Sequence, residues 1–227
     1  MSYIKKFVPI LLIGKIASGK TTAANILTKY GFKEYMFASP LKQFALSLGF
    51  NYKNVYGSQE DKLAIDENWN ISAREFLQKF GTEVCREALP KAIPNMNMNG
   101  RTLWARAMEN NIKNAEPLVI SDGRFLDEAK LVRDYDGIII RLVRNTSDEK
   151  YSSNHVSESS INEIEEDYVI RNNGSIKDLE TQLVDILQFE GIIEYPKKMK
   201  RENIIDMLVF VFTIFCCIIL QRCLMIT

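Results

Sequence analysis

The stretch Gly14-Lys15-Ile16-Ala17-Ser18-Gly19-Lys20-Thr21 matches the pattern G-x-x-x-x-G-K-[ST] of phosphate-binding loops at every position. The apolar run 7–13 before it is short, as in a buried strand, and residues 22–30 after it have helical spacing. This strand–loop–helix context is the one in which the pattern binds phosphate. The alternative, a glycine turn that matches by chance, is disfavoured by that context. The stretch therefore predicts a nucleotide site at the end of a first strand.

Each part of the loop has an expected task. Gly14 and Gly19 can adopt backbone angles closed to other residues, so that successive N–H groups turn toward the phosphates. The start of the helix adds its partial positive charge. We expect Lys20 to reach the β- and γ-phosphates and the Thr21 hydroxyl to bind Mg²⁺. The residues expected to hold the nucleotide are Gly14, Ala17, Ser18, Gly19, Lys20, Thr21 and Thr22.

Length and composition allow one substantial core and a tail. Of the 227 residues, 46% are hydrophobic and 26% are charged, and the formal net charge is zero. A nucleic acid polymer is bound through a basic stripe, so this balance favours a small nucleotide over a nucleic acid partner. The cysteines show neither paired metal spacing nor a secreted disulfide framework. They are Cys85, Cys216, Cys217 and Cys223. A reducing compartment and a cytoplasmic location are expected.

Strands and helices alternate along most of the chain. The expected strands lie at 7–13, 35–38, 117–121, 137–143 and 168–170. The expected helices lie at 22–30, 71–80, 102–114, 126–135 and 176–187. A further helix should start at Ser39 as N-cap, and Ser72 with Glu75 predicts a capping box. The pattern predicts an α/β fold, a P-loop three-layer sandwich in which helices cover both faces of a parallel sheet.

Polar residues follow several of the expected strands. In a parallel sheet the carboxyl ends of the strands meet at one edge, where ligands gather. Ser39 and the group Asp122-Gly123-Arg124 lie at such ends. An aspartate at this place can hold Mg²⁺ directly or through water. The alternative for this group is an Asp-Gly turn beside a solvated arginine.

Phosphoryl transfer favours cationic groups that grip phosphate oxygens in pairs, as arginine does. Several arginines begin or end elements or lie in loops, although for any one of them a solvated side chain is the default. They are Arg74, Arg86, Arg124, Arg141 and Arg144. Residues 145–160 are almost wholly polar, which is typical of a mobile lid. They contain the only histidine, His155, so no histidine metal cluster can form, and we expect it to be a lid contact or solvated.

Seven segments together resemble the deoxynucleoside monophosphate kinases of tailed phages and large DNA viruses, a branch of the adenylate-kinase-like P-loop kinases. The segments are Gly14–Thr22, Ala38–Lys42, Arg74–Glu83, Ser121–Glu128, Arg141–Arg144, His155–Glu158 and Val169–Ser175. The resemblance extends over residues 7–188. Outside the phosphate loop, no single segment is specific for this family. The six segments together, in the order in which the family has them, are difficult to obtain by chance.

This resemblance implies transfer of the γ-phosphate of ATP to a deoxynucleoside 5′-monophosphate in the presence of Mg²⁺. It implies catalytic roles for Lys20, Asp122, Arg124 and Arg144, the last from the lid side, with Thr21 and Asp122 at the metal. The implied acceptor-binding residues are Ser39, Lys42, Arg74, Gln78, Arg124 and His155, and Asn172 joins the ATP site. This chain departs from the family at two positions: Asn173 stands where an aspartate is usual, and Ser39 stands where an acidic residue is common.

Other functions remain open. A kinase of another small metabolite, such as dephospho-coenzyme A, shares the loop, the sheet and the lid. A non-catalytic nucleotide-binding membrane adaptor is favoured by the tail. A small GTPase also starts with this loop, but its D-x-x-G imitation at 134–137 lies between a helix and a strand, and no [NT]-K-x-D motif occurs.

The resemblance does not cover the end of the chain. We expect a kinase-like domain over 1–190, a basic linker over 191–203 and a hydrophobic anchor helix over 204–226. Residues 207–220 are 14 uncharged residues, fewer than the ~20 that span a bilayer core. If the longer helix 204–226 spans the bilayer, the charged residues Asp206 and Arg222 must therefore lie near the two membrane–water interfaces. Apolar residues cover every face of it, which favours a membrane anchor over a packed soluble helix.

The basic cluster Lys197–Arg201 should hold the kinase domain on the cytoplasmic side. Cys223, near the end of the expected anchor helix, is a candidate for acylation. The oligomeric state is left open, with a homodimer among the options.

Overall fold

The computed structural model describes residues 3–114, 116–145 and 160–194. Nearly all of them belong to one compact unit, Ile4–Ile193. The second unit, Met1–Tyr3 with Glu194–Thr227, lies almost wholly outside the described residues, and so do the expected anchor, most of the linker and the lid with His155. Among the helices of the described ranges, none combines the length and the apolar character that a membrane crossing requires.

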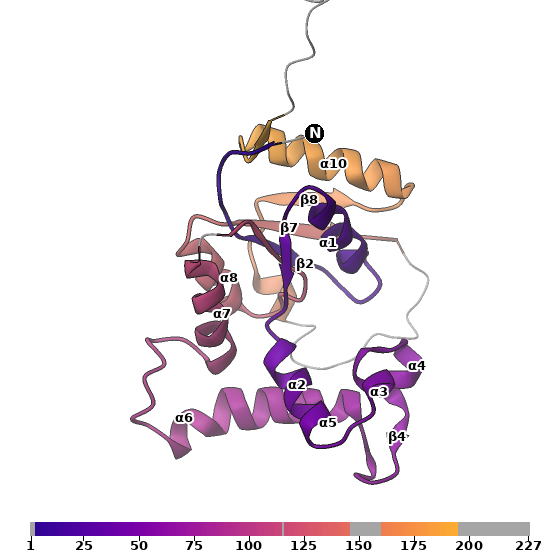
Figure 1. The fold of residues 1–227 in the computed structure, drawn as a ribbon, viewed down its shortest axis with the longest axis vertical. Coiled ribbons are helices and arrows are strands. Elements are labelled where there is room, and N and C mark those ends of the chain that lie inside the picture. The colour runs from indigo at the N-terminus through magenta and orange to yellow at the C-terminus, as the bar shows by residue number, and fades with distance from the viewer. Residues whose placement is uncertain (1–2, 115, 146–159, 195–227) are drawn as a thin grey trace, which may run out of the picture. The chain divides into compact units, whose positions relative to one another are not determined.

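Five parallel strands form the central sheet (Figure 1). Their order is β3 (Lys33–Tyr35), β6 (Leu118–Ile120), β2 (Ile10–Ile13), β7 (Ile138–Val143) and β8 (Tyr168–Arg171). The central strand, β2, leads into the phosphate loop, and its Ile10 pairs with Val119 of β6 and with Ile138 of β7. The predicted parallel sheet is confirmed. Two short strands, β1 (Tyr3–Ile4) and β9 (Ile193–Glu194), pair separately.

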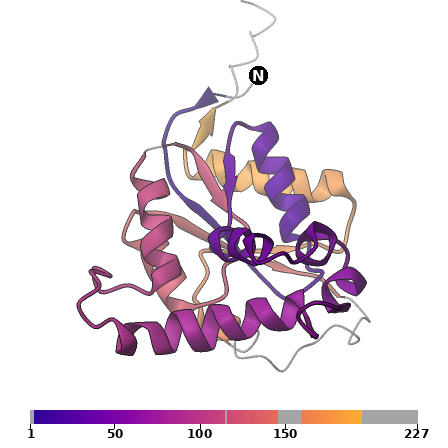
Figure 2. The same cartoon turned by 60° about the horizontal axis from the view of Figure 1, so that its bottom comes forward.

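Strand β2 is buried along its whole length because its alternate side chains enter two different cores. Ile10 and Leu12 belong to one core, and Leu11 and Ile13 to the other. The helices that close these cores are α1 (Lys20–Lys29) with α10 (Ile176–Phe189), and α7 (Leu103–Lys113) with α8 (Leu126–Arg133). Figure 2 shows the two pairs on opposite sides of the sheet. The prediction of helices on both faces is therefore also confirmed.

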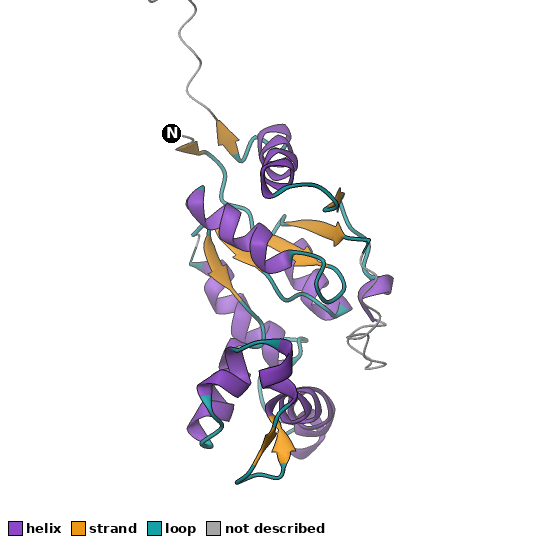
Figure 3. Cartoon of the chain, turned by 90° about the vertical axis from the view of Figure 1, so that its right-hand side faces the viewer, coloured by secondary structure: helices purple, strands orange, loops and turns teal. Residues whose placement is uncertain are grey.

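A third group of helices has a small core of its own. These helices are α2 (Ser39–Ser47), α3 (Tyr52–Tyr56), α4 (Gln59–Leu63) and α5 (Ala73–Lys79). Their shared core is built on Ala45, Phe50, Val55 and Ala73. Between α4 and α5 the chain forms an antiparallel pair, β4 (Ile65–Asp66) with β5 (Ile71–Ser72), which Figure 3 shows beside these helices.

Helix α5 runs on as the π-helix η1 (Phe80–Ala88) and then as α6 (Leu89–Ala92). Figures 1 and 2 show the three as one continuous rod. The indole Nε1 of Trp104 donates to the carbonyl of Gly81 at 2.9 Å, so a side chain from α7 bonds the backbone of the π-helix. The last short helix, η3, is a 3₁₀ turn at Ser160–Glu163.

The second strand and the helix after it differ from the expectation. Strand β3 ends at Tyr35 rather than at Ala38. The reason is that the N–H groups of Phe37 and Ala38 donate to the carboxylate of Asp122 instead of pairing with a strand. The N-cap of α2 is Ala38, so the expected N-cap Ser39 is wrong, and Ser39 is the first helical residue.

The polar region before α5 holds more helix than its sequence indicated. Helix α3 was not expected; its N-cap Asn51 accepts a hydrogen bond from the Lys53 N–H at 2.8 Å. Ser72 is confirmed as the N-cap of α5, since its hydroxyl accepts from the Glu75 N–H at 3.1 Å. The capping box is not completed, because the Glu75 carboxylate pairs with Lys79 at 2.7 Å.

Candidate active site

The phosphate loop between β2 and α1 needs its two glycines for steric reasons. Gly14 has φ +144°, and a Cβ there would lie 2.4 Å from the carbonyl oxygen of Leu142. Gly19 has φ +103°, and a Cβ there would lie 2.1 Å from the Nδ2 of Asn172. Ala17 also has a positive φ, 62°, which costs an L-residue roughly 1 kcal/mol. The loop backbone is therefore fixed by residues of β7 and of the segment after β8.

Lys20 is the first residue of α1, and its side chain folds back over the loop. Its Nζ donates to the carbonyls of Gly14 at 2.6 Å and Lys15 at 2.9 Å. The ammonium group thus lies at the mouth of the loop, as the motif requires. Thr21 is exposed and Thr22 half-buried in the first turn of the helix. Ser18 is buried at 3% exposure.

Asn172 contacts the backbone of the loop. It is buried at 8% exposure, and its Nδ2 donates to the Ser18 carbonyl at 2.9 Å. Its backbone N–H donates to the Val143 carbonyl at 2.8 Å, next to the exposed Arg144 at the end of β7. These contacts make Asn172 a support of the loop.

Asp122 follows β6 and bonds to the start of α2. Its two carboxylate oxygens accept the N–H groups of Phe37 at 2.8 Å and Ala38 at 3.0 Å. Burial raises the pKa of Asp122, while these hydrogen bonds and the charges of Lys42 and Arg124 oppose the rise. The side chain therefore ties the carboxyl end of β6 to the start of α2.

Lys42 and Arg124 also belong to a group of cations gathered from four elements. The members are Lys42 of α2, Lys62 of α4, Arg74 of α5 and Arg124 after β6. Burial lowers the pKa of Lys62, and the positive charges of Lys42, Arg74 and Arg124 lower it further. Burial likewise lowers the pKa of Lys42, with Asp122 acting against it and Arg124 adding to it. Such mutual repulsion is the arrangement expected of an anion site.

Further contacts orient members of this cluster. The Lys42 ammonium lies 5.1 Å from the ring centroid of Tyr56. The guanidinium of Arg74 donates to the side-chain oxygen of Gln59. Gln78, one turn after Arg74 on α5, is half-buried, as is Ser39 at the start of α2. Lys62 was not predicted, because it lies in a polar stretch without a motif and only the fold brings it to the other cations.

Arg141 and Arg86, two of the five candidate arginines, pair with carboxylates of the fold instead of being solvated. Arg141 donates to the Glu166 carboxylate at 2.8 Å and to the Ile164 carbonyl at 2.6 Å. Arg86 pairs with Asp127 and, at 2.9 Å, with Glu128. Burial raises the pKa of Glu128, and the charge of Arg86 and the hydrogen bond from the Arg124 N–H oppose the rise. The contacts around this carboxyl group are all donors, which fits its ionised form.

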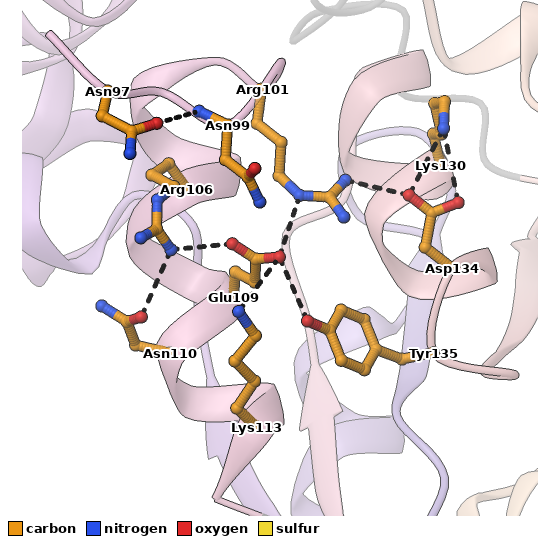
Figure 4. A network of polar contacts seen from close by, with 10 residues as sticks. All are labelled: Asn97, Asn99, Arg101, Arg106, Glu109, Asn110, Lys113, Lys130, Asp134 and Tyr135. Carbon is orange, nitrogen blue, oxygen red and sulfur yellow. Dashed lines mark hydrogen bonds and ion pairs between the residues drawn. The ribbon is translucent and has the colours of Figure 1, made fainter.

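A second buried carboxylate lies outside the site, on α7 (Figure 4). Glu109 is bonded by Arg106 at 2.7 Å, Tyr135 at 3.1 Å, Arg101 at 3.3 Å and Lys113 at 3.5 Å. Burial alone would raise the pKa of Glu109, but the hydrogen bond from Tyr135 and the charges of Lys113 and Arg101 lower it. With every partner supplied by α7, α8 and the turns beside them, this network is structural.

Within the described residues, no three of His, Cys, Asp or Glu are grouped as metal ligands. The exposed hydroxyl of Thr21 at the helix start suits a Mg²⁺ that is bound mainly by phosphates and water. Asp122 uses both oxygens for backbone bonds, which leaves lone pairs for a water-mediated contact.

Comparison by sequence finds relatives of this chain. The family described as deoxynucleotide monophosphate kinase matches residues 47–183. A provisionally named deoxynucleotide monophosphate kinase of Acanthamoeba polyphaga mimivirus is 35% identical over 184 residues, 76% of this chain and 92% of the relative.

Solved kinases match this chain at low identity and low TM-score. Thymidylate kinase from Candida albicans matches with a TM-score of 0.46 and 12% identity, over 86% of this chain and 97% of that one. Dephospho-CoA kinase from Campylobacter jejuni matches with a TM-score of 0.41 and 14% identity, over 80% and 96%. Values this low say nothing about substrate. The match to the family and the identity to the mimivirus relative show that the chain belongs to the deoxynucleotide monophosphate kinase family.

Proposed function

We propose that this kinase transfers the γ-phosphate of ATP to a deoxynucleoside 5′-monophosphate bound by Lys42, Lys62, Arg74 and Arg124. The observation that supports the proposal is this cluster of cations. The charges of Lys42, Arg74 and Arg124, together with burial, lower the pKa of Lys62. A phosphate dianion is the ligand that relieves their repulsion. Because Arg124 follows β6 and Lys20 follows the adjacent strand β2, the acceptor and the donor phosphates would meet at one edge of the sheet.

The reaction needs charge neutralisation more than proton transfer. An oxygen of the acceptor phosphate attacks the γ-phosphorus, and the bond from that phosphorus to the β–γ bridging oxygen breaks, giving ADP and a deoxynucleoside diphosphate. The acceptor is already ionised near neutral pH, so little general-base help is required. In this proposal Lys20 neutralises the β- and γ-phosphates, and Arg124 with Arg74 orients the acceptor in line.

The remaining proposed roles follow the same logic. Mg²⁺ near Thr21, with Asp122 at its side through water, would supply further neutralisation of the ATP phosphates. Arg144 at the end of β7 and His155 in the lid segment would complete the site from the lid side.

A kinase that acts on a hydroxyl, such as a dephospho-coenzyme A kinase, is less well supported. A hydroxyl acceptor must lose a proton and benefits from a nearby base. The groups gathered on the acceptor side are cations, and the carboxylate beside them, Asp122, accepts two backbone hydrogen bonds. This favours an acceptor that is itself an anion.

The test is a panel with the purified full chain, ATP and Mg²⁺, with ADP formation as the readout. The acceptors are the four deoxynucleoside monophosphates, their ribonucleotide counterparts and dephospho-coenzyme A. We expect turnover with at least one deoxynucleoside monophosphate and little with dephospho-coenzyme A. Turnover with dephospho-coenzyme A alone would overturn the acceptor assignment, and no turnover with any acceptor would favour the non-catalytic adaptor.

For residues 204–226 we propose a membrane anchor, supported by their apolar composition on every helical face. The full chain and a form ending at Tyr195 should be expressed and fractionated after an alkaline carbonate wash. We expect only the full chain to stay with the membranes. If both wash off, the anchor is excluded.

A further inference from the structure

Glu128 connects the acceptor side of the site to the π-helix η1. It lies in the first turn of α8 and is 3% exposed. Its Oε2 accepts the backbone N–H groups of Arg124 at 2.8 Å and Phe125 at 3.2 Å. Its Oε1 accepts from the Nη2 of Arg86 at 2.9 Å. One buried carboxylate therefore bonds both the backbone of Arg124 and a side chain of η1.

Arg86 contacts this segment at several points. Its guanidinium lies 3.8 Å from the ring centroid of Phe125, the residue after Arg124. It also pairs with Asp127, whose other oxygen accepts the Thr102 hydroxyl. The Arg86 side chain is 12% exposed, so these contacts are largely shielded from water.

The same segment is anchored at its other end by Asp122, through the N–H groups of Phe37 and Ala38. Residues 122–128 thus join the start of α2, which carries Lys42, to η1, which continues the helix that carries Arg74. Arg124 lies in the middle of this segment. The position of its guanidinium relative to the other cations depends on how firmly both ends are fixed.

We propose that Arg86 and Glu128 are positioning residues, which fix the backbone of Arg124 so that its guanidinium grips the acceptor phosphate. The inference rests on the proposed function, in which Arg124 contacts that phosphate. The competing role is stability alone, in which the pair only joins α8 to η1. The two roles differ in the Michaelis constant for the acceptor, since stability alone leaves the folded enzyme's kinetics unchanged.

The test variant replaces both partners, Arg86→Met with Glu128→Gln, because removing one alone would leave a buried charge unpaired. Its KM for the deoxynucleoside monophosphate that the wild type uses fastest should rise about 10-fold, with the KM for ATP within about twofold. If this variant does not fold, Arg86→Lys keeps the charge but loses the planar fork, and it should shift the same constant in the same direction.

A matched control lies in the network of Figure 4. Arg101 is 13% exposed and pairs with both Glu109 and Asp134, much as Arg86 pairs with Glu128 and Asp127. The double variant Arg101→Met with Glu109→Gln should lower the melting temperature without changing either Michaelis constant. This control measures how the loss of a buried ion pair changes stability and kinetics when the backbone of Arg124 keeps its contacts.

A double-mutant cycle with Arg124→Lys completes the experiment. If the pair acts through Arg124, this substitution should add less than about threefold to the acceptor KM in the Arg86/Glu128 background. An unchanged acceptor KM in that background, or a full additional effect of Arg124→Lys, would overturn the inference. Turnover of the wild type, measured in parallel, separates this failure from a failure of the proposed function, and calorimetric dissociation constants for the monophosphate give the same cycle without turnover.

Discussion

The phosphate loop is shaped by its backbone, whereas the proposed acceptor side is assembled from side chains. The loop is one contiguous stretch whose glycines have positive φ and lie against Leu142 and Asn172. The acceptor cations come from α2, α4, α5 and the segment after β6, and buried carboxylates fix the chain around them. A binding site formed by backbone N–H groups tolerates almost no change in backbone conformation. A binding site formed by several side chains can lose one of them and keep the others, so single substitutions there should weaken substrate binding by different amounts.

The largest effect is expected for Lys20→Met, on the loop side. The Nζ lies at the loop mouth, 2.6 Å from the Gly14 carbonyl, where charge develops on the transferred group. Loss of this cation should reduce turnover by about 10³-fold or more. The measurement is steady-state ADP formation, with circular dichroism as the control for folding. Near-normal turnover in a folded variant would contradict the assigned role.

Gly19→Ala should come next, through the shape of the loop. The added methyl group meets the Nδ2 of Asn172, which must then give up its bond to the Ser18 carbonyl, and alanine is strained at φ +103°. We expect a loss of about 2–3 kcal/mol of unfolding free energy, measured by urea denaturation.

The companion variant Asn172→Ala removes the side chain that Gly19→Ala would meet. If the clash is the cause, the double variant should be more stable than the sum of the two single losses predicts. If the two losses of unfolding free energy simply add, backbone strain at residue 19 is the only cause of the loss in Gly19→Ala. Gly14→Ala offers the contrast, because its Cβ would meet the backbone oxygen of Leu142, which no side-chain substitution can remove.

On the acceptor side, Arg124→Lys should affect one substrate only. Lysine keeps the charge but loses the planar fork, so the KM for the monophosphate should rise about 10- to 100-fold while the KM for ATP changes little. Arg133→Lys, on the outer face of α8 with Asp167 as partner, is the matched control and should change neither constant. Equal shifts in both constants for Arg124→Lys would mean that the residue does not distinguish acceptor from donor.

The same contrast explains what could be predicted from the sequence. The loop residues are contiguous, so their arrangement follows from the motif and from the strand and helix around it. The place of Asp122 and Arg124 could be predicted, because they follow a strand at the carboxyl edge of a parallel sheet, while their roles remain proposals. Lys62 was not predicted, and Arg86 was named only as one of five candidate arginines, since the contacts of both are created by the path of the folded chain. Ser39 was misread as a cap because Asp122, distant in sequence, bonds the backbone there.

The smallest effect concerns Lys62 and the protons exchanged on binding. In the free enzyme, burial and the neighbouring cations lower the pKa of Lys62. A bound phosphate dianion favours the charged ammonium, so the pKa should return toward the ordinary lysine value of about 10.4. Between the lowered and the restored pKa, binding must therefore take up protons.

Isothermal titration calorimetry at about pH 9, in buffers of different ionisation enthalpy, measures this uptake directly. At that pH the monophosphate, whose second pKa is about 6, is already a dianion and contributes no proton. Wild type should take up a fraction of a proton per site, and Lys62→Met should take up less and bind more weakly.

The Lys62→Met variant without ligand should also unfold at a higher temperature than wild type, because near neutral pH it no longer carries a charged lysine among like charges. The exposed Lys130→Met, which loses only a surface pair with Asp134, should match wild type in uptake. If wild type and Lys62→Met take up equal numbers of protons, Lys62 does not face the acceptor phosphate, and the cluster must close around its ligand with Lys42, Arg74 and Arg124 alone.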